Sequence, residues 1–101
     1  MTPPSGLALP MAEIAELCRR YHVRELAVIG SAARGEMRPD SDIDFLVDFQ
    51  PNAPGGLLDY AGLMLDLSEL LRRKVDLVER EALKPLIRKA VLSEARTIYA
   101  T

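Results

Sequence analysis

The chain has 101 residues, of which 49% are apolar and 28% are charged. These proportions are typical of a single soluble globular domain and exclude an intrinsically disordered chain. Its 13 Lys and Arg side chains stand against 15 Asp and Glu side chains, which gives a formal net charge of −2 at pH 7. A surface that binds long nucleic acids usually carries clustered basic residues in excess, so we expect no such partner.

The sequence contains a single cysteine, Cys18, so it can form neither an internal disulfide nor a cysteine-rich zinc site. The N-terminus lacks the basic residue and apolar stretch of a secretory signal, and no apolar run approaches the ~18 residues needed to span a bilayer. We therefore expect a cytoplasmic protein with no membrane partner. Cys18 lies on an apolar helical stripe and is expected in the core.

The first part of the chain predicts a tail, a helix and a strand. Residues 1–9 contain prolines and a glycine, and we expect a flexible tail ahead of one domain over residues 10–101. Pro10 suits a first helical turn, and the apolar residues after it recur at helical spacing. The apolar run over residues 26–29 ends at Gly30 and predicts a strand that is covered on both faces.

A second strand is predicted over residues 42–49, where apolar side chains alternate with others and therefore share one face. These apolar residues are Ile43, Phe45, Val47 and Phe49. A loop rich in Pro and Gly follows over residues 51–56, and helical spacing then runs from Leu57 to about residue 73. The apolar stripe of this helix is wider than one packing face requires, which is typical either of a larger core or of a partner surface.

Residues 74–78 predict a third short strand, Pro85 begins another helix, and residues 97–99 predict a final strand. The order of these elements indicates an α+β fold, a single small domain in which helices pack on a mixed β-sheet.

Several polar residues are expected to have ordinary surface positions. The basic residues 72–74 are expected at a solvated helix end, where cations suit the helix dipole. His22 is expected in a capping or surface role near the end of the first helix. Asp48 is expected at a solvated strand end.

Gly30 and Ser31 lie where the first strand ends, at a point where a short helical turn can begin. Glycine leaves the neighbouring backbone accessible. Exposed N–H groups at the start of a helix, together with a hydroxyl group, suit a phosphate oxygen. The pair by itself has two interpretations, an ordinary turn or a turn that binds phosphate.

Asp42 and Asp44 are two residues apart on a predicted strand, so their side chains point to the same side with Cα atoms about 6.5–7 Å apart. Two carboxylates held in this way repel each other unless a divalent cation bridges them. Asp76 has a similar context, because Val75 and Leu77 face the core while it points the other way. If its strand lies beside the second, the three acids form one cluster; otherwise they are a solvated turn and exposed charges.

These candidate residues follow one order along the chain: a Gly-Ser pair, ten residues, two acids separated by one residue, and a later acid on a strand. In this sequence they are Gly30, Ser31, Asp42, Asp44 and Asp76. The pattern resembles the signature of the DNA polymerase β-like nucleotidyltransferase superfamily. Residues 30–35 and 38–44 are similar to its minimal nucleotidyltransferase (MNT) branch in particular, and the likeness covers about residues 23–99.

The resemblance implies a nucleotidyltransferase core and a role for each matched residue. Gly30 and Ser31 would contact the phosphates of a nucleoside triphosphate, here ATP. Asp42, Asp44 and Asp76 would hold two Mg²⁺ ions, and Asp76 would also help to activate the acceptor hydroxyl. The implied reaction is in-line attack on the α-phosphorus with release of pyrophosphate, which depends largely on positioning and electrostatics.

Arg34 and Arg38 lie close to the Gly-Ser pair in the sequence. Each has two interpretations, a cofactor-binding contact to the triphosphate or a solvated surface position.

The resemblance also implies a partner. Small members of this kind resemble antitoxins that are paired with HEPN-domain ribonuclease toxins and silence them by adenylylating a tyrosine. We therefore expect Mg²⁺-dependent transfer of AMP from ATP to a hydroxyl group of such a toxin. Two alternatives stay open: an antitoxin that blocks its toxin without catalysis, and transfer to a small molecule such as an aminoglycoside. Whether the chain forms a homo-oligomer is also left open.

Overall fold

The computed structural model describes residues 9–36, 38 and 40–101. The helices and strands, in chain order, are α1 (Met11–Arg20), β1 (Val23–Ile29), α2 (Gly30–Ala33), β2 (Ile43–Phe49), α3 (Leu57–Leu71), β3 (Val75–Glu79), the 3₁₀ turn η1 (Arg80–Ala82), α4 (Pro85–Glu94) and β4 (Arg96–Ala100). Each predicted helix and strand is present. The first strand is longer than predicted, because it begins at Val23 rather than at residue 26.

The predicted tail falls almost entirely outside the described residues, which begin at Leu9. Leu9 itself packs against the core as a partly buried residue, so the packed part of the chain includes a residue that was predicted to lie in the tail. None of the helices in the described ranges combines the length and the apolar character that crossing a bilayer would require.

The four strands form one mixed sheet in the order β3-β2-β1-β4. β1 pairs antiparallel with both β2 and β4, whereas β2 and β3 are parallel. Parallel neighbours need a crossover connection, and α3 provides it between β2 and β3. The structure thus confirms the predicted α+β fold with a mixed sheet.

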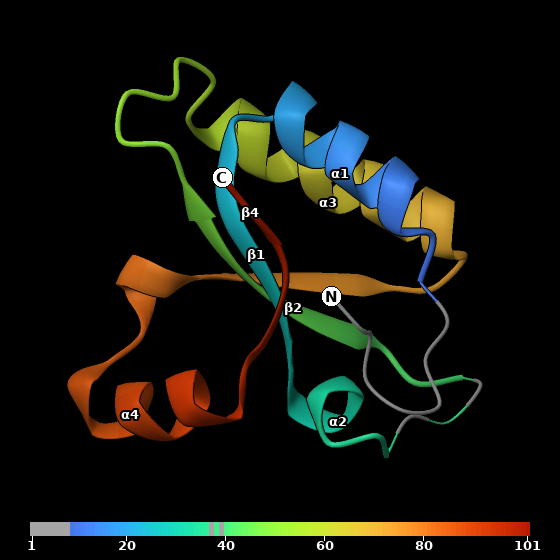
Figure 1. Cartoon of the computed structure of the whole chain (residues 1–101), viewed down its shortest axis with the longest axis vertical. Coiled ribbons are helices and arrows are strands. Elements are labelled where there is room, and N and C mark those ends of the chain that lie inside the picture. Colours follow the sequence, from blue (N-terminus) through green and yellow to red (C-terminus); the bar gives the residue numbers. More distant parts are fainter. Residues whose placement is uncertain (1–8, 37, 39) are drawn as a thin grey trace.

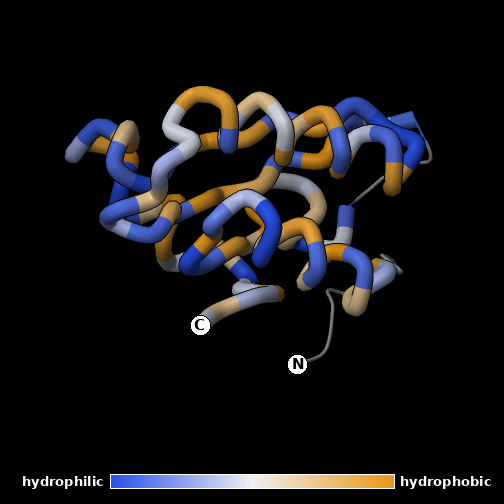
Figure 2. Tube along the Cα trace, turned by 90° about the horizontal axis from the view of Figure 1, so that it is seen from above, coloured by the Kyte–Doolittle hydropathy of each residue, from blue (hydrophilic) through white to orange (hydrophobic). Residues whose placement is uncertain are grey.

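The helices cover both faces of this sheet, with α1 and α3 on one face and α2 and α4 on the other (Figure 1). The larger apolar cluster lies under α1 and α3. Its fully buried side chains come from both helices and the central strands, among them Ile14, Val28, Phe45, Leu63 and Leu67. Apolar and hydrophilic stretches alternate along the helices (Figure 2), as expected for helices that each bury one side.

A smaller apolar cluster lies on the opposite face, where Ala27, Leu46 and Leu83 pack with partly buried residues of α4. Side chains of a strand alternate between the two faces of the sheet. Asp44 therefore lies on the face of Leu46, and Asp76 lies on the face that carries α2 and α4. The acidic residues and the larger core are consequently on opposite sides of the same strands.

The wide apolar stripe of α3 is divided between core and solvent. Leu63 and Leu67 are fully buried, whereas Leu57 and Leu58 are each 79% exposed and Leu65 is 64% exposed. The larger-core interpretation of the stripe is therefore correct for only part of it. Leu57, Leu58 and Leu65 form an exposed apolar strip on α3.

α3 ends in an unfavourable backbone conformation that predicts a stabilising substitution. Arg72 follows Leu71 with φ 53° and ψ 41°, in the left-handed region that disfavours side chains and favours glycine at helix ends. Arg72→Gly should raise the free energy of unfolding by about 0.5–1 kcal/mol, measured by urea denaturation. Arg72→Ala keeps a Cβ atom at the same φ and should give no gain. Equal stabilisation by both variants would show that the arginine side chain, and not the backbone, sets the effect.

Candidate active site

The parallel pairing of β2 and β3 places two acidic residues side by side. Asp44 in β2 is in register with Asp76 in β3, and on its other side Asp44 is in register with Ile29 at the end of β1. Neighbouring strands are about 4.8 Å apart, so both carboxylates lie at the end of the sheet where β2 and β3 begin. The predicted condition for Asp76, a strand beside the second one, is met.

The electrostatics of Asp44 report the same proximity. Burial raises the pKa of the Asp44 carboxyl above its ordinary value, and the negative charges of Asp76 and Asp42, with a hydrogen bond to Asp76, raise this pKa further. Asp42 is exposed and lies just before β2, with its Oδ2 atom 3.9 Å from Nζ of Lys74. The charges of Asp42 and Asp76 therefore both act on Asp44, which lies between them in the predicted cluster.

Gly30 stands directly against this cluster. Its φ is +64°, a conformation that side chains rarely adopt, and a Cβ atom at this position would lie 3.1 Å from Oδ2 of Asp44. Glycine is thus favoured both by the backbone turn and by the close approach of a carboxylate. Ser31 follows in α2, where its carbonyl oxygen accepts a hydrogen bond of 2.9 Å from the N–H group of Glu36.

Arg34 lies at the end of α2 and is bound to two carboxylates. It donates hydrogen bonds to Glu36, at 2.5 Å, and to Glu94 at the end of α4, at 2.6 Å. The hydrogen bond to Glu36 and the charge of Glu94 raise the pKa of its guanidinium group. Arg34 therefore links α2 to α4, and it would have to exchange these partners to reach a triphosphate. Arg38 is exposed.

The donor set fits a divalent cation, although it is not assembled as a complete site. In residues 9–36, 38 and 40–101, no three His, Cys, Asp or Glu side chains are arranged so as to hold a metal ion. Carboxylate oxygens are nevertheless the ligands that Mg²⁺ prefers. The raised pKa of Asp44 shows that its charge is poorly compensated by the protein, which is the condition that a bound cation would relieve.

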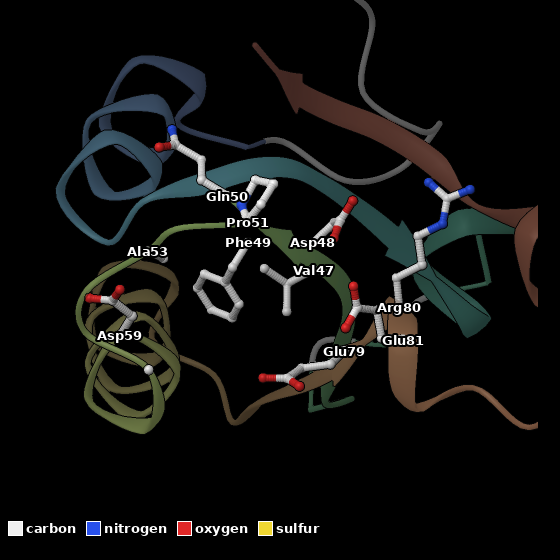
Figure 3. Close-up of a pocket in the computed structure, with 11 residues that line it drawn as sticks. Val47, Asp48, Phe49, Gln50, Pro51, Ala53, Asp59, Glu79, Arg80 and Glu81 are labelled. Atoms are coloured by element: carbon white, nitrogen blue, oxygen red, sulfur yellow. The ribbon is translucent and has the colours of Figure 1, made fainter.

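Two cavities of the described part of the chain lie away from these acids. One, of about 240 Å³, is at the far end of β2, where Asp48, Phe49, Asp59 and Glu79 are among the lining residues (Figure 3). The other lies between α1 and α3 and is lined mainly by acidic side chains and leucines. Neither cavity includes a predicted site residue.

Three expectations for polar residues need correction or extension. Asp48 is not a solvated strand end: it is only 9% exposed and accepts a hydrogen bond of 3.0 Å from Nε of Arg24. His22 does follow the first helix, but its Nδ1 atom also lies 3.1 Å from Oδ2 of the buried Asp59. Arg73, expected at a solvated helix end, donates hydrogen bonds to two backbone carbonyl groups.

Comparison with known proteins identifies the class. The nucleotidyltransferase domain family model matches residues 11–98, so the chain belongs to the nucleotidyltransferase domain family and is an enzyme of that class.

Proteins similar to this chain belong to the minimal nucleotidyltransferase branch, in agreement with the resemblance seen in the sequence. The chain is 48% identical over 79 residues, 78% of each protein, to protein adenylyltransferase MntA of Thermococcus cleftensis. A solved structure assigned as a minimal nucleotidyltransferase superposes with a TM-score of 0.73 at 44% identity, covering 84% of this chain and 85% of the other. A toxin–antitoxin structure with AMP-PNP has the same fold, with a TM-score of 0.73 at 22% identity over 92% of this chain and 75% of that one.

The crowding of Asp44 predicts how the metal-free protein responds to pH. The pKa of Asp44 in the folded state is raised above its usual value of 3.8. Above the raised pKa, the ionised carboxylate therefore lowers the free energy of unfolding. This destabilisation is lost as the pH falls toward 3.8, because the carboxyl group becomes protonated. Asp44→Asn should therefore raise Tm at pH 7 by a few degrees in the presence of a chelator. The gain should shrink on acidification.

Asp40→Asn is the matched control, because it removes one negative charge from an exposed position just before β2. It should leave Tm nearly unchanged across the same pH range. A fall in Tm for Asp44→Asn at pH 7 without metal would mean that Asp44 is a structural residue.

Proposed function

We propose that this chain transfers AMP from ATP to a hydroxyl group of a partner protein, with Mg²⁺ as cofactor, and that the partner is a cytoplasmic HEPN-type toxin. The observation that carries the proposal is the pairing of Asp44 with Asp76 directly beside Gly30 in a nucleotidyltransferase fold. The 48% identity to protein adenylyltransferase MntA supports a protein as acceptor. The fold shared with a toxin–antitoxin structure solved with AMP-PNP supports the partner and the nucleotide.

Each site residue then has a defined task. Asp42, Asp44 and Asp76 would hold the divalent cations, which when bound offset the negative charge on the attacking and leaving oxygens. Asp76 accepts the proton of the acceptor hydroxyl as its oxygen bonds to the α-phosphorus. The bond between the α-phosphorus and its bridging oxygen breaks at the same time, and pyrophosphate leaves.

The Gly-Ser turn and the two arginines act on the donor nucleotide. Gly30 keeps the space beside Asp44 free of a side chain, and Ser31 binds a phosphate oxygen. Arg34 and Arg38 bind the triphosphate, Arg34 by exchanging Glu36 and Glu94 for phosphate oxygens. Arginine suits such an exchange because it always carries its charge and donates in a planar fork.

A second function, blocking of the toxin without catalysis, is supported by the apolar strip of α3. Leu57, Leu58 and Leu65 are large apolar side chains exposed to solvent, and such surfaces are typical of protein interfaces. The two functions are compatible, but only the catalytic function requires the acidic residues.

The catalytic proposal predicts labelling that depends on Asp44. The chain, its co-purified partner, Mg²⁺ and ATP labelled in the α-phosphate should give a labelled partner, and Asp44→Asn should lower the rate by at least about 100-fold because a cation ligand is lost. The readout is partner-bound label together with the mass increase of one AMP. Asp40→Asn is the control and should label normally. Equal labelling by wild type and Asp44→Asn would contradict the catalytic assignment.

Toxin neutralisation in cells separates catalysis from blocking. The double substitution Asp42→Asn/Asp44→Asn should abolish protection from the toxin while the complex still co-purifies, since the substitutions leave α3 and its leucines unchanged. Full protection by the double variant would instead show that blocking is sufficient. The double substitution Leu58→Ser/Leu65→Ser tests whether the apolar strip of α3 contacts the toxin. If it does, this variant should co-purify less of the toxin.

A further inference from the structure

Arg73 reaches from the end of α3 back to the loop that precedes β2. Its Nη1 group donates hydrogen bonds to the backbone carbonyl oxygen of Arg38, at 2.9 Å, and to that of Ser41, at 3.3 Å. Hydrogen bonds from a charged donor are stronger than those between neutral groups. One half-buried side chain thus holds both ends of the short segment that leads into Asp42.

The segment held by Arg73 is also closed by its own hydrogen bonds. The N–H group of Ser41 donates to the carbonyl oxygen of Arg38 at 3.0 Å. The N–H group of Arg38 donates to Oγ of Ser41, also at 3.0 Å. The carbonyl group of Arg38 therefore accepts from both Ser41 and Arg73, so the Arg73 side chain adds to a contact that Arg38 and Ser41 already make with each other.

Lys74 completes the contact on the other side of Asp42. Its carbonyl oxygen accepts a hydrogen bond of 3.0 Å from the N–H group of Ile43. Arg73 and Lys74 are consecutive residues of the connection between α3 and β3. Arg73 holds Ser41, the residue before Asp42, and Lys74 holds Ile43, the residue after it. Two residues further along, the same connection carries Asp76 into register with Asp44.

We propose that Arg73 is a positioning residue that fixes the backbone of Asp42 relative to Asp44 and Asp76. In the described structure its side chain contacts none of these three acids, and it acts through the carbonyl groups of Arg38 and Ser41. The proposal rests on the proposed function, in which Asp42 is a ligand of the divalent cation. Loss of Arg73 should therefore weaken cation binding without unfolding the domain.

The chain offers a matched control for this side chain. Arg88 also donates a hydrogen bond from Nη1 to a backbone carbonyl oxygen, that of Arg80 at 3.3 Å, and is also half-buried. It lies on α4 and contacts η1, beyond the end of β3, away from the acids. Arg88→Ala removes the same kind of contact elsewhere in the domain, so it reports the general effect of losing one guanidinium–carbonyl hydrogen bond.

The first measurement needs no activity. Backbone hydrogen exchange of Arg73→Ala should be about tenfold faster at Ser41 and Ile43 than in wild type, while exchange in the interior of β2, at Phe45 and Val47, stays unchanged. Arg88→Ala should leave all four amides unchanged. Arg73→Lys keeps the charge and a donor and should give an intermediate rate at Ser41.

The second measurement is binding of Mn²⁺, a paramagnetic substitute for Mg²⁺, in the presence of AMP-PNP. Arg73→Ala should bind Mn²⁺ about tenfold more weakly, as expected when a residue that orients a metal ligand is lost, with Arg73→Lys intermediate and Arg88→Ala equal to wild type. If wild type binds no Mn²⁺, the proposed function is wrong, and hydrogen exchange alone then decides whether Arg73 fixes the loop.

Three results would overturn the proposal. The first is unchanged exchange at Ser41 in Arg73→Ala. The second is faster exchange throughout the sheet, or failure of both Arg73 variants to fold, because either shows a general structural role. The third is an equal loss of Mn²⁺ affinity in Arg73→Ala and Arg88→Ala.

Discussion

The site depends on one constraint, the parallel register of β2 and β3 that places Asp44 beside Asp76. Two carboxylates do not approach each other spontaneously, so other contacts must hold the strands in this register. The opposite face of the same strands supplies them, because Ile43, Phe45 and Leu77 are at most 5% exposed there. Since side chains alternate along a strand, burying one face fixes where the other face points.

The larger apolar core and the acidic residues of the candidate site thus lie on different faces of one sheet. The larger apolar cluster lies with α1 and α3, whereas the acids share their face with the smaller cluster around Ala27, Leu46 and Leu83. The acidic face opposes folding locally, as the raised pKa of Asp44 shows. Functional sites commonly carry such destabilising groups, which the remainder of the fold must offset.

Much of this arrangement could be predicted from the sequence because it follows from local periodicity. Alternation over residues 42–49 indicated the second strand. The position of Asp76 between Val75 and Leu77 indicated that its side chain points away from the larger core. Both are short-range properties of the backbone. The family resemblance implied that Asp76 joins Asp42 and Asp44, which periodicity alone leaves undecided, and the structure pairs β2 with β3 in the register that this requires.

The interactions that could not be predicted depend on contacts between distant residues. Arg24 meets Asp48 next to an irregularity in the pairing of β1 and β2, between Val23 and Glu25, and no local pattern marks such a shift. The sequence marks Arg73 only as a basic residue at a helix end. Its contacts with the loop before β2 depend on the fold, which brings that loop beside the end of α3. The leucines of α3 share one broad stripe, and only packing decides which half is covered.

β3 is the outermost strand of the sheet, and in the described part of the chain no other strand pairs with its outer side. Asp76 consequently lies on an edge strand of the sheet, and the two described cavities are elsewhere. Under the proposed function, an acceptor would approach Asp76 from the side of this edge strand. Discrimination between acceptors would then depend on the fit of two surfaces, which is how folded proteins recognise one another.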